Sequence, residues 1–343
     1  MLLLHRMLKP ETYPAEAEAR CPDILATWKH YAPDTQPVER DFEDWAENAH
    51  FLHAMNKIGP VQLVPEHRGY GWSGDMTGSV PENPAAEPAF MYGIFRPMDA
   101  IAFPVRANLL WNNASVTSVI QDYALSPVFQ RYAGRRIDVV DLTQEAIETC
   151  LESLYTNGLR DGFVKSRVKG FAWRFHLTQA ERLFQQMDRD EQIAWMTVSH
   201  EGARKALLIQ EAYRPIREYR MIIVGDKPVS GAGCIEAFTP CDSMGLRFDE
   251  RMEEVRNSDT VISDPATTAR YIDFATNFAK EWAQAHGNSS AYSLDLSINA
   301  ETGDVTPIEL NPMMNLGLYA NHPDFMIEAL LTSSNPSPEA LAM

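Results

Sequence analysis

The sequence has few cysteines for its length. Only four occur among 343 residues, and no two of them form a C-x-x-C motif. Cys234 and Cys241 are close enough along the chain to suggest a zinc pair, but no further Cys or His lies nearby in sequence to complete it. We therefore interpret Cys21, Cys150, Cys234 and Cys241 as reduced thiols of a cytoplasmic protein.

Long apolar runs are also missing. No run approaches the roughly 18 apolar residues of a membrane-spanning helix, so none is predicted. The first residues contain one short run of leucines and resemble neither a signal peptide nor a membrane anchor.

Basic residues are scarce relative to acidic ones. The chain has 30 Lys and Arg against 47 Asp and Glu, a formal net charge of −17. A field of this sign repels polyanions, which argues against nucleic acid or an anionic membrane surface as a partner. A small phosphorylated ligand in a locally basic pocket stays compatible with it. Length and composition suit a globular protein of two or three domains, and they predict no oligomeric state.

Strand and helix patterns alternate through the second half of the chain. Residues 135–142 read as a strand, and residues 143–158 as a helix with Thr143 as N-cap and Asn157-Gly158 as its stop. The other predicted elements are strands at 161–168, 206–209 and 219–224, helices at 178–202 and 268–287, and a hairpin turn at Gly225-Asp226.

The stretch SLDLSINAETGDVTPIELNP, residues 293–312, predicts a β-hairpin. A three-residue loop ending at Gly303 puts glycine where left-handed backbone is required. The register centred on Thr302 gives one apolar face, in which the pairs are Leu294 with Leu310, Leu296 with Ile308, and Ile298 with Thr306.

The opposite face of this hairpin pairs Asp295 with Glu309, and Asn311 lies on the same side. Carboxylates about 5 Å apart between Cβ atoms repel unless a cation or proton lies between them. Together with an amide oxygen they form a set of hard ligands that suits Mg²⁺ shared with substrate phosphates. A solvated polar face is the alternative, and the hairpin alone favours neither.

The hairpin resembles the terminal metal motif of the ATP-grasp superfamily. In that family an acid on one strand and E-x-N on the next hold the magnesium ions of ATP, and Asp295, Glu309 and Asn311 are the matching positions. Three further motifs upstream match in the same order, so the resemblance covers roughly residues 135–320.

The stretch LIQEAYRPIREYRMIIVGDKPV is similar to the family's hinge and the strand pair after it. The resemblance implies that backbone around Glu211, Ala212 and Tyr213 meets adenine, that Glu218 binds the ribose, and that Arg220 is the basic residue of an E-Y-R variant. Read without the family, Glu218 and Arg220 would be an ordinary surface ion pair.

The stretch DGFVKSRVKG resembles the strand that carries the family's phosphate-binding lysine. Lys165 would reach the α- and β-phosphates, and Arg167 and Lys169 lie on the loop that follows. The usual Gly/Ser-rich loop is absent. The family's first lysine has no counterpart, and Arg96 and Arg106 are the candidates to replace it, as arginine does in a phage- and bacteria-associated clade.

An acidic loop, FDERMEEVRNSD, contains or borders three more arginines. Arg247, Arg251 and Arg256 are candidates to reach the γ-phosphate or an acceptor carboxylate, and charges of a solvated loop are the alternative.

The resemblance implies an α+β (α/β) fold in which two ATP-grasp subdomains clamp ATP, preceded by an N-terminal α/β domain. The expected division is an N-terminal pre-ATP-grasp and substrate domain at 1–115, a central lid subdomain at 116–206, a C-terminal subdomain with the metal hairpin at 207–330, and a loose tail at 331–343.

The activity that the resemblance implies is ATP-dependent ligation of the EC 6.3 type. A carboxylate is activated as an acylphosphate and joined to an amine, with Lys165 and Arg220 as catalytic residues and ATP and Mg²⁺, which Mn²⁺ could replace, as cofactors. The partners would be small-molecule or peptide carboxylates and amines, which the sequence does not identify. The alternatives are a phosphotransferase acting on a small-molecule hydroxyl and a nucleotide-binding module without chemistry. The complete acid–acid–amide set argues against the latter.

Overall fold

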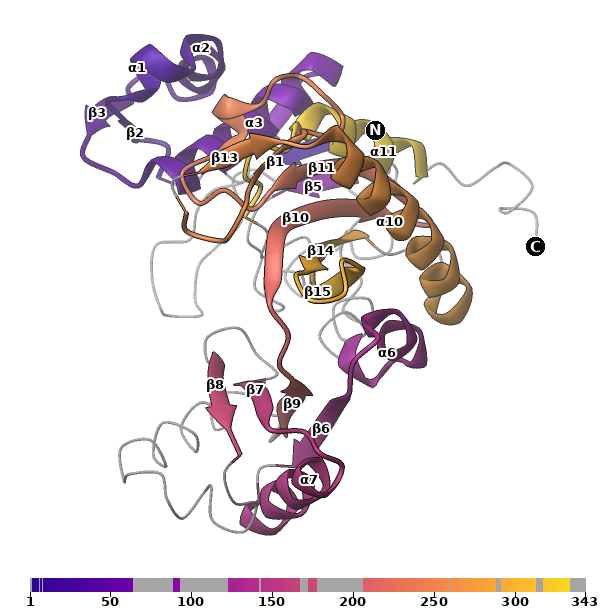
Figure 1. Ribbon diagram of the computed structural model, residues 1–343. Helices are drawn as coiled ribbons and strands as arrows, with labels where there is room; N and C mark the ends of the chain where they lie inside the picture. Colours follow the sequence, from indigo (N-terminus) through magenta and orange to yellow (C-terminus); the bar gives the residue numbers. More distant parts are fainter. Residues whose placement is uncertain are drawn as a thin grey trace, which may run out of the picture.

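The computed structural model describes residues 2–5, 7, 9–63, 89–92, 123–141, 143–166, 172–177, 206–258, 260–287, 291–312 and 317–333. Helices and strands alternate through these segments, which confirms the predicted α+β class. Figure 1 shows the N-terminal elements at the top, a second sheet in the middle and a third sheet below it. The helix predicted at 178–202 lies outside the described residues.

The N-terminal elements surround a short parallel sheet and a helical layer. Strand β1 (Leu2–His5) lies between β4 (Val61–Leu63) and β5 (Ala89–Tyr92). Trp28 and Trp45 are fully buried and meet edge to face at 5.8 Å, which locks two of the helices together. The remaining elements are β2 (Thr12–Pro14), α1 (Ala17–Arg20), α2 (Pro22–Tyr31), β3 (Gln36–Val38) and α3 (Phe42–Ile58).

The lower sheet has four antiparallel strands in the order β6-β9-β7-β8. Helix α7 (Gln144–Thr156) packs on it through a stripe that includes Leu151 and Leu154. The predicted caps of α7 are confirmed, since the Thr143 hydroxyl accepts from the Ala146 N–H and Gly158 is left-handed. The strands are β6 (Ile137–Asp141), β7 (Asp161–Ser166), β8 (Ala172–His176) and β9 (Ala206–Glu211).

The middle sheet is also antiparallel, in the order β11-β10-β14-β15. Helix α10 (Pro265–His286) covers one face with fully buried Tyr271, Phe278 and Trp282. It begins three residues before the predicted start because Asp264 caps it, accepting from the Thr267 N–H. The strands and short elements are β10 (Pro215–Val224), β11 (Lys227–Gly233), η3 (Pro240–Asp242), β12 (Arg251–Glu253), β13 (Val261–Ser263), β14 (Ala291–Asn299) and β15 (Val305–Pro312).

The β14–β15 hairpin confirms part of the predicted register. Leu294 pairs with Leu310 and Asp295 with Glu309, and Gly303 is left-handed as expected. Beyond a β-bulge the register shifts, so Leu296 pairs with Pro307 rather than with Ile308, and Ile298 pairs with Val305 rather than with Thr306. Proline has no N–H to donate to the strand ladder and is tolerated at bulges, which explains why the register shifts next to Pro307.

Two helical segments pack differently from what the predicted domain division implied. Segment η1–α6 (Tyr123–Leu125 and Pro127–Ala133) shares a core with α10 and the middle sheet, although 116–206 was predicted as the lid. Helix α11 (Pro323–Ser333) was not predicted; it packs on α3, and it takes in the first residues of the segment predicted as a loose tail. The division into domains otherwise stays a prediction.

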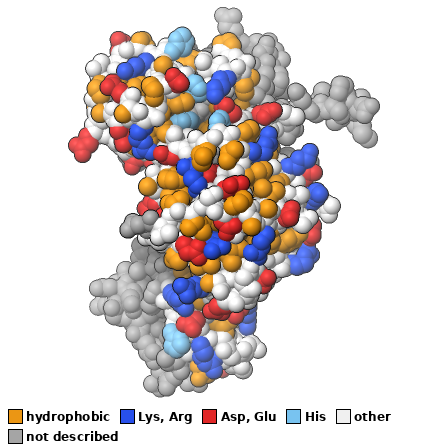
Figure 2. All heavy atoms as spheres, turned by 45° about the horizontal axis from the view of Figure 1, so that its top comes forward, with side chains coloured by type: hydrophobic (Ala, Val, Ile, Leu, Met, Phe, Trp, Pro, Cys, Tyr) orange, Lys and Arg blue, Asp and Glu red, His pale blue; other side chains and the backbone are white. Residues whose placement is uncertain are grey.

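Among the described helices, none has both the length and the apolar character that crossing a bilayer would require. On the face shown in Figure 2, acidic and basic side chains are interspersed over the described residues. On this face, the described residues therefore form no continuous basic track for a polyanion.

We expect the packing of α10 on the middle sheet to dominate the stability of this part of the fold. Trp282 is fully buried against Phe278 and Tyr292, so Trp282→Ala should lower the free energy of unfolding by about 3–5 kcal/mol. Leu246→Ala, at a side chain 47% exposed, is the control and should change it by less than about 0.5 kcal/mol. Equal effects in urea unfolding would contradict this packing.

Candidate functional site

A row of charged side chains crosses three strands of the middle sheet. Arg220 on β10 lies opposite Asp295 on β14, and Asp295 lies opposite Glu309 on β15. Their neighbours Met221 and Leu294 point to the other face and are fully buried in the core. Alternation along each strand therefore places the charged row on the face away from α10.

Arg220 and Asp295 form a buried two-point ion pair. The guanidinium donates from Nε to Oδ1 at 2.8 Å and from Nη2 to Oδ2 at 2.6 Å, and the residues are 5% and 6% exposed. Burial alone would lower the pKa of Arg220, but the Asp295 carboxylate outweighs it and holds the pKa well above its usual range. The alternative of a surface pair between Glu218 and Arg220 is thus wrong.

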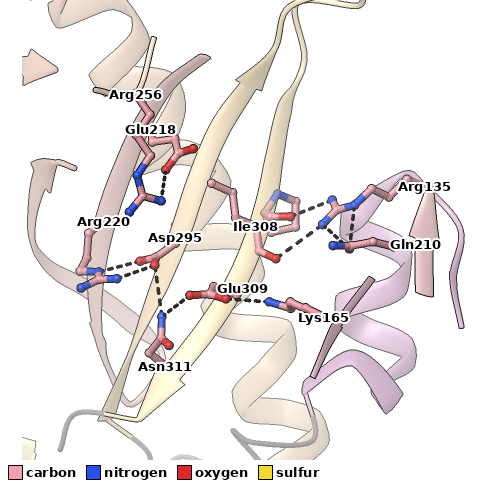
Figure 3. Close-up of polar contacts among 11 residues, drawn as sticks. Arg135, Lys165, Gln210, Glu218, Arg220, Arg256, Asp295, Ile308, Glu309 and Asn311 are labelled. Carbon is pink, nitrogen blue, oxygen red and sulfur yellow. Dashed lines mark hydrogen bonds and ion pairs between the residues drawn. The ribbon is translucent and has the colours of Figure 1, made fainter. Parts of the chain in front are cut away.

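Glu309 receives its cation from the lower sheet. The Lys165 ammonium on β7 donates to Glu309 Oε2 at 2.7 Å, so one ion pair joins the two sheets (Figure 3). Burial opposes ionisation of Glu309, yet Lys165 outweighs it and lowers the pKa of Glu309 to about 2. Burial likewise opposes the charge on Lys165, but Tyr123 and Glu309 raise its pKa.

Asn311 connects the two acids. Its Nδ2 donates to Asp295 Oδ2 and to Glu309 Oε1, both at 3.1 Å. The acids therefore face two protein cations and an amide donor, and the repulsion predicted from sequence is relieved by Arg220 and Lys165. The described residues contain no group of three or more His, Cys, Asp or Glu side chains that could hold a metal.

The hairpin nevertheless fits a hard cation that is shared with a ligand. Two carboxylates and an amide oxygen match the ligand chemistry of Mg²⁺ when phosphate oxygens complete the shell. Asn311 would have to turn its amide so that oxygen replaces Nδ2, and Glu309 would have to exchange Lys165 for the metal.

Glu218 lies beside the row and pairs with a different arginine. A bulge between Ile216 and Tyr219 puts Arg217 in the left-handed region, with φ of 56°. Arg256 Nη1 donates to Glu218 Oε2 at 3.3 Å. Burial raises the pKa of Glu218, which Arg256 opposes.

The predicted hinge follows strand β9. The N–H groups of Glu211 and Ala212 donate to the carbonyls of Arg136 and Asp161. The Tyr213 hydroxyl hydrogen-bonds Ser297 on β14 at 3.0 Å, so the hinge contacts both sheets.

Arg135 is a further candidate site residue, which the sequence did not single out. Its guanidinium lies 4.7 Å from the centre of the Tyr213 ring and donates to the Pro307 carbonyl at 2.8 Å and to Gln210 Oε1 at 3.3 Å. Burial lowers its pKa. The only signal was its place at the start of the strand predicted at 135–142.

Of the remaining predicted cations, the structure describes only the arginines of the acidic loop. Arg96, Arg106, Arg167 and Lys169 lie outside the described residues. Arg251 pairs with Asp249, and Arg247 lies near Glu328. Of the three arginines of the acidic loop, Arg256 alone contacts a predicted site residue within the described part of the chain.

Helix α3 reaches the row from the N-terminal region. Glu47 accepts from the Leu318 N–H, and the neighbouring Gly317 carbonyl accepts from Arg220 Nη1 at 2.6 Å. A Cβ at Gly317 would lie 3.4 Å from both Arg220 Nη1 and Glu43 Oε1, which is the near limit of van der Waals contact. Burial raises the pKa of Glu47 to about 8.

No protein-family model matches the sequence, and no curated protein matches it. Solved structures do resemble it. A RimK domain ATP-grasp protein from Sphaerobacter thermophilus is 13% identical at a TM-score of 0.45, covering 86% of this chain and 97% of that one. D-alanyl-alanine synthetase A from Vibrio cholerae is 13% identical at 0.47, covering 97% and 98%.

The ATP-grasp ligase PsnB, solved with a minimal precursor, Mg and ADP, is 14% identical at a TM-score of 0.48, covering 84% of this chain and 94% of that one. At these identities and TM-scores, likeness carries no argument about function, which is inferred below from the residues of this chain.

Glu47 should make stability fall as pH rises. Its folded pKa of about 8 exceeds its ordinary value of 4.5, so between these values the folded chain binds more protons than the unfolded chain. Glu47→Gln keeps an oxygen for Leu318 and should reduce the loss of unfolding free energy between pH 5 and 8 by roughly 3 kcal/mol. Glu152→Gln, exposed on α7, is the control. An unchanged pH dependence in Glu47→Gln would contradict the assignment.

The buried pair should behave as a unit. Arg220→Met leaves Asp295 charged and unpaired and should lower the free energy of unfolding by about 3–5 kcal/mol, whereas Arg220→Met/Asp295→Leu should cost much less than the sum of the single changes. Arg131→Met, which breaks the exposed pair with Glu281, should cost under about 1 kcal/mol. Additive single effects in urea unfolding would argue against the pair.

Proposed function

We propose that this chain is an ATP-dependent ligase of the ATP-grasp type that activates a carboxylate and joins it to an amine. The observation that carries the proposal is the ion pair between Lys165 and Glu309. It brings a cation from one sheet onto an acid of another, beside a second acid and an amide, where a nucleotide phosphate and its metal would compete for the same partners.

The nucleotide would lie between the middle and lower sheets. The N–H groups of Glu211 and Ala212 already donate hydrogen bonds to the carbonyls of Arg136 and Asp161. Adenine would therefore meet the carbonyls of this hinge and the backbone of Tyr213. Glu218, beside the charged row, would accept from the ribose hydroxyls. Arg135, stacked on Tyr213, would hold the hinge against the hairpin.

Asp295, Glu309 and Asn311 would hold Mg²⁺, which when bound supplies a Lewis acid contact to phosphate oxygens. Lys165 would then move from Glu309 to a phosphate. Arg220 would keep its two-point bond to Asp295 and so fix the orientation of that carboxylate. The positive charges of Lys165 and Arg220 would both lower the cost of negative charge on the transferred phosphoryl group.

No covalent protein nucleophile enters this scheme. An acylphosphate is destroyed by water, so the site must exclude it while an amine attacks. The acceptors, the membership of the arginine-bearing clade, and a cytoplasmic location stay predictions, as does the use of Mn²⁺.

The decisive assay is phosphate release from Mg-ATP with a panel of carboxylates, each with and without amines. We expect ADP and phosphate to appear only when carboxylate and amine are both present. Release of ADP with a stable phosphorylated product and no dependence on amine would replace the ligase with the phosphotransferase.

Two substitutions test the metal-holding residues. Asp295→Asn and Glu309→Gln should each lower kcat/KM for Mg-ATP by about 100-fold or more, because charge stabilisation at the phosphates is lost. Glu301→Gln and Asp304→Asn, exposed at the turn of the same hairpin, are matched controls. Thermal unfolding of every variant separates loss of function from loss of fold, and wild-type activity in folded Glu309→Gln would sink the assignment.

A further inference from the structure

Two cysteines that are far apart in sequence meet outside the charged row. Cys21 precedes α2, and Cys241 lies in η3, yet both side chains pack in the same buried cluster, close enough for the two thiols to interact. Both are free in this structure. The sequence offered Cys241 no Cys or His neighbour besides Cys234, and the fold adds Cys21 and His50.

The contact between these two segments is reinforced by the adjacent residues. Arg20 Nη2 donates to Asp242 Oδ2 at 2.8 Å, so consecutive residues of one segment meet consecutive residues of the other. The Arg20 guanidinium also lies 4.0 Å from the centre of the Phe42 ring. These contacts keep the two cysteine-bearing segments next to each other without a covalent bond.

The two thiols have unequal surroundings. Cys241 Sγ lies 4.0 Å from His50 Nδ1, which also contacts the Ala46 carbonyl at 2.8 Å, and Thr239 adds a further hydrogen bond. The hydrogen bond from Cys21, followed by the contacts with His50 and Thr239, lowers the pKa of Cys241 to about 5. The same shared bond and burial raise the pKa of Cys21.

We propose that Cys21 and Cys241 are a redox modification site that closes reversibly to a disulfide, with Cys241 as the thiol oxidised first. A metal site is the other use of such residues. However, the described part of the chain holds no metal-competent group of three or more His, Cys, Asp or Glu side chains, here or elsewhere.

Because the Cys241 thiolate is partly buried, the oxidant must be small, and hydrogen peroxide meets this requirement. The Cys241 thiolate attacks one peroxide oxygen, breaks the O–O bond and becomes a sulfenic acid, while the other oxygen leaves as hydroxide and is protonated to water. The Cys21 sulfur, losing its proton, then attacks the Cys241 sulfur and displaces the second oxygen as water. Two thiols and one hydrogen peroxide thus give one disulfide and two waters.

The test is mass spectrometry of the full chain exposed to hydrogen peroxide at pH 7. We expect a loss of two hydrogens, a cross-linked peptide pair containing Cys21 and Cys241, and full reversal by dithiothreitol. Cys150→Ser, the matched control, should leave the cross-link intact, whereas Cys241→Ala and Cys21→Ala should each abolish it.

A second measurement needs no variant. At pH 6, Cys241 should react with iodoacetamide at least about tenfold faster than Cys150, because its larger thiolate fraction outweighs its lower intrinsic nucleophilicity. A peroxide product linked through Cys150 or Cys234, irreversible oxidation of Cys241 without a cross-link, or equal alkylation rates would overturn the proposal.

Discussion

The charges on Asp295 and Glu309 constrain the rest of the site. They lie directly opposite each other on neighbouring strands, where like charges destabilise a hairpin unless something neutralises them. Arg220 comes from the adjacent strand and Lys165 from a different sheet. The arrangement of the two sheets and the chemistry of the site thus depend on the same two acids.

The two ion pairs have different strengths and different consequences. Arg220 and Asp295 are almost fully buried and joined at two points, so separating them is costly and the pair acts as a fixed part of the sheet. Lys165 and Glu309 are joined at one point and are partly exposed. A phosphate and its metal could take their places, which makes this pair the one that a ligand would rearrange.

The part of the site that depends on local pattern could be predicted from sequence. Alternation along the hairpin and the demand for a left-handed Gly303 were enough to pair Asp295 with Glu309. The predicted register is wrong between the turn and Pro307 and right from Glu309 onward, because a bulge between Asp295 and Leu296 shifts the pairing by one residue.

The partners of the charges could not be predicted, since they depend on strand order and on contacts between sheets. Read without the family resemblance, Glu218 and Arg220 suggested an ordinary surface pair. In the structure Arg220 pairs with Asp295, and Glu218 pairs with Arg256. Arg135 on Tyr213 and Cys21 beside Cys241 are likewise products of packing between distant segments.

The most direct test of the account is calorimetric titration of the full chain with a non-hydrolysable ATP analogue, with and without Mg²⁺. We expect one nucleotide to bind per chain, with an affinity that depends on Mg²⁺ and falls in Lys165→Met. Absence of binding, or equal affinity with Mg²⁺, without it and in Lys165→Met, would contradict the assignment of the hairpin and Lys165 to a nucleotide site.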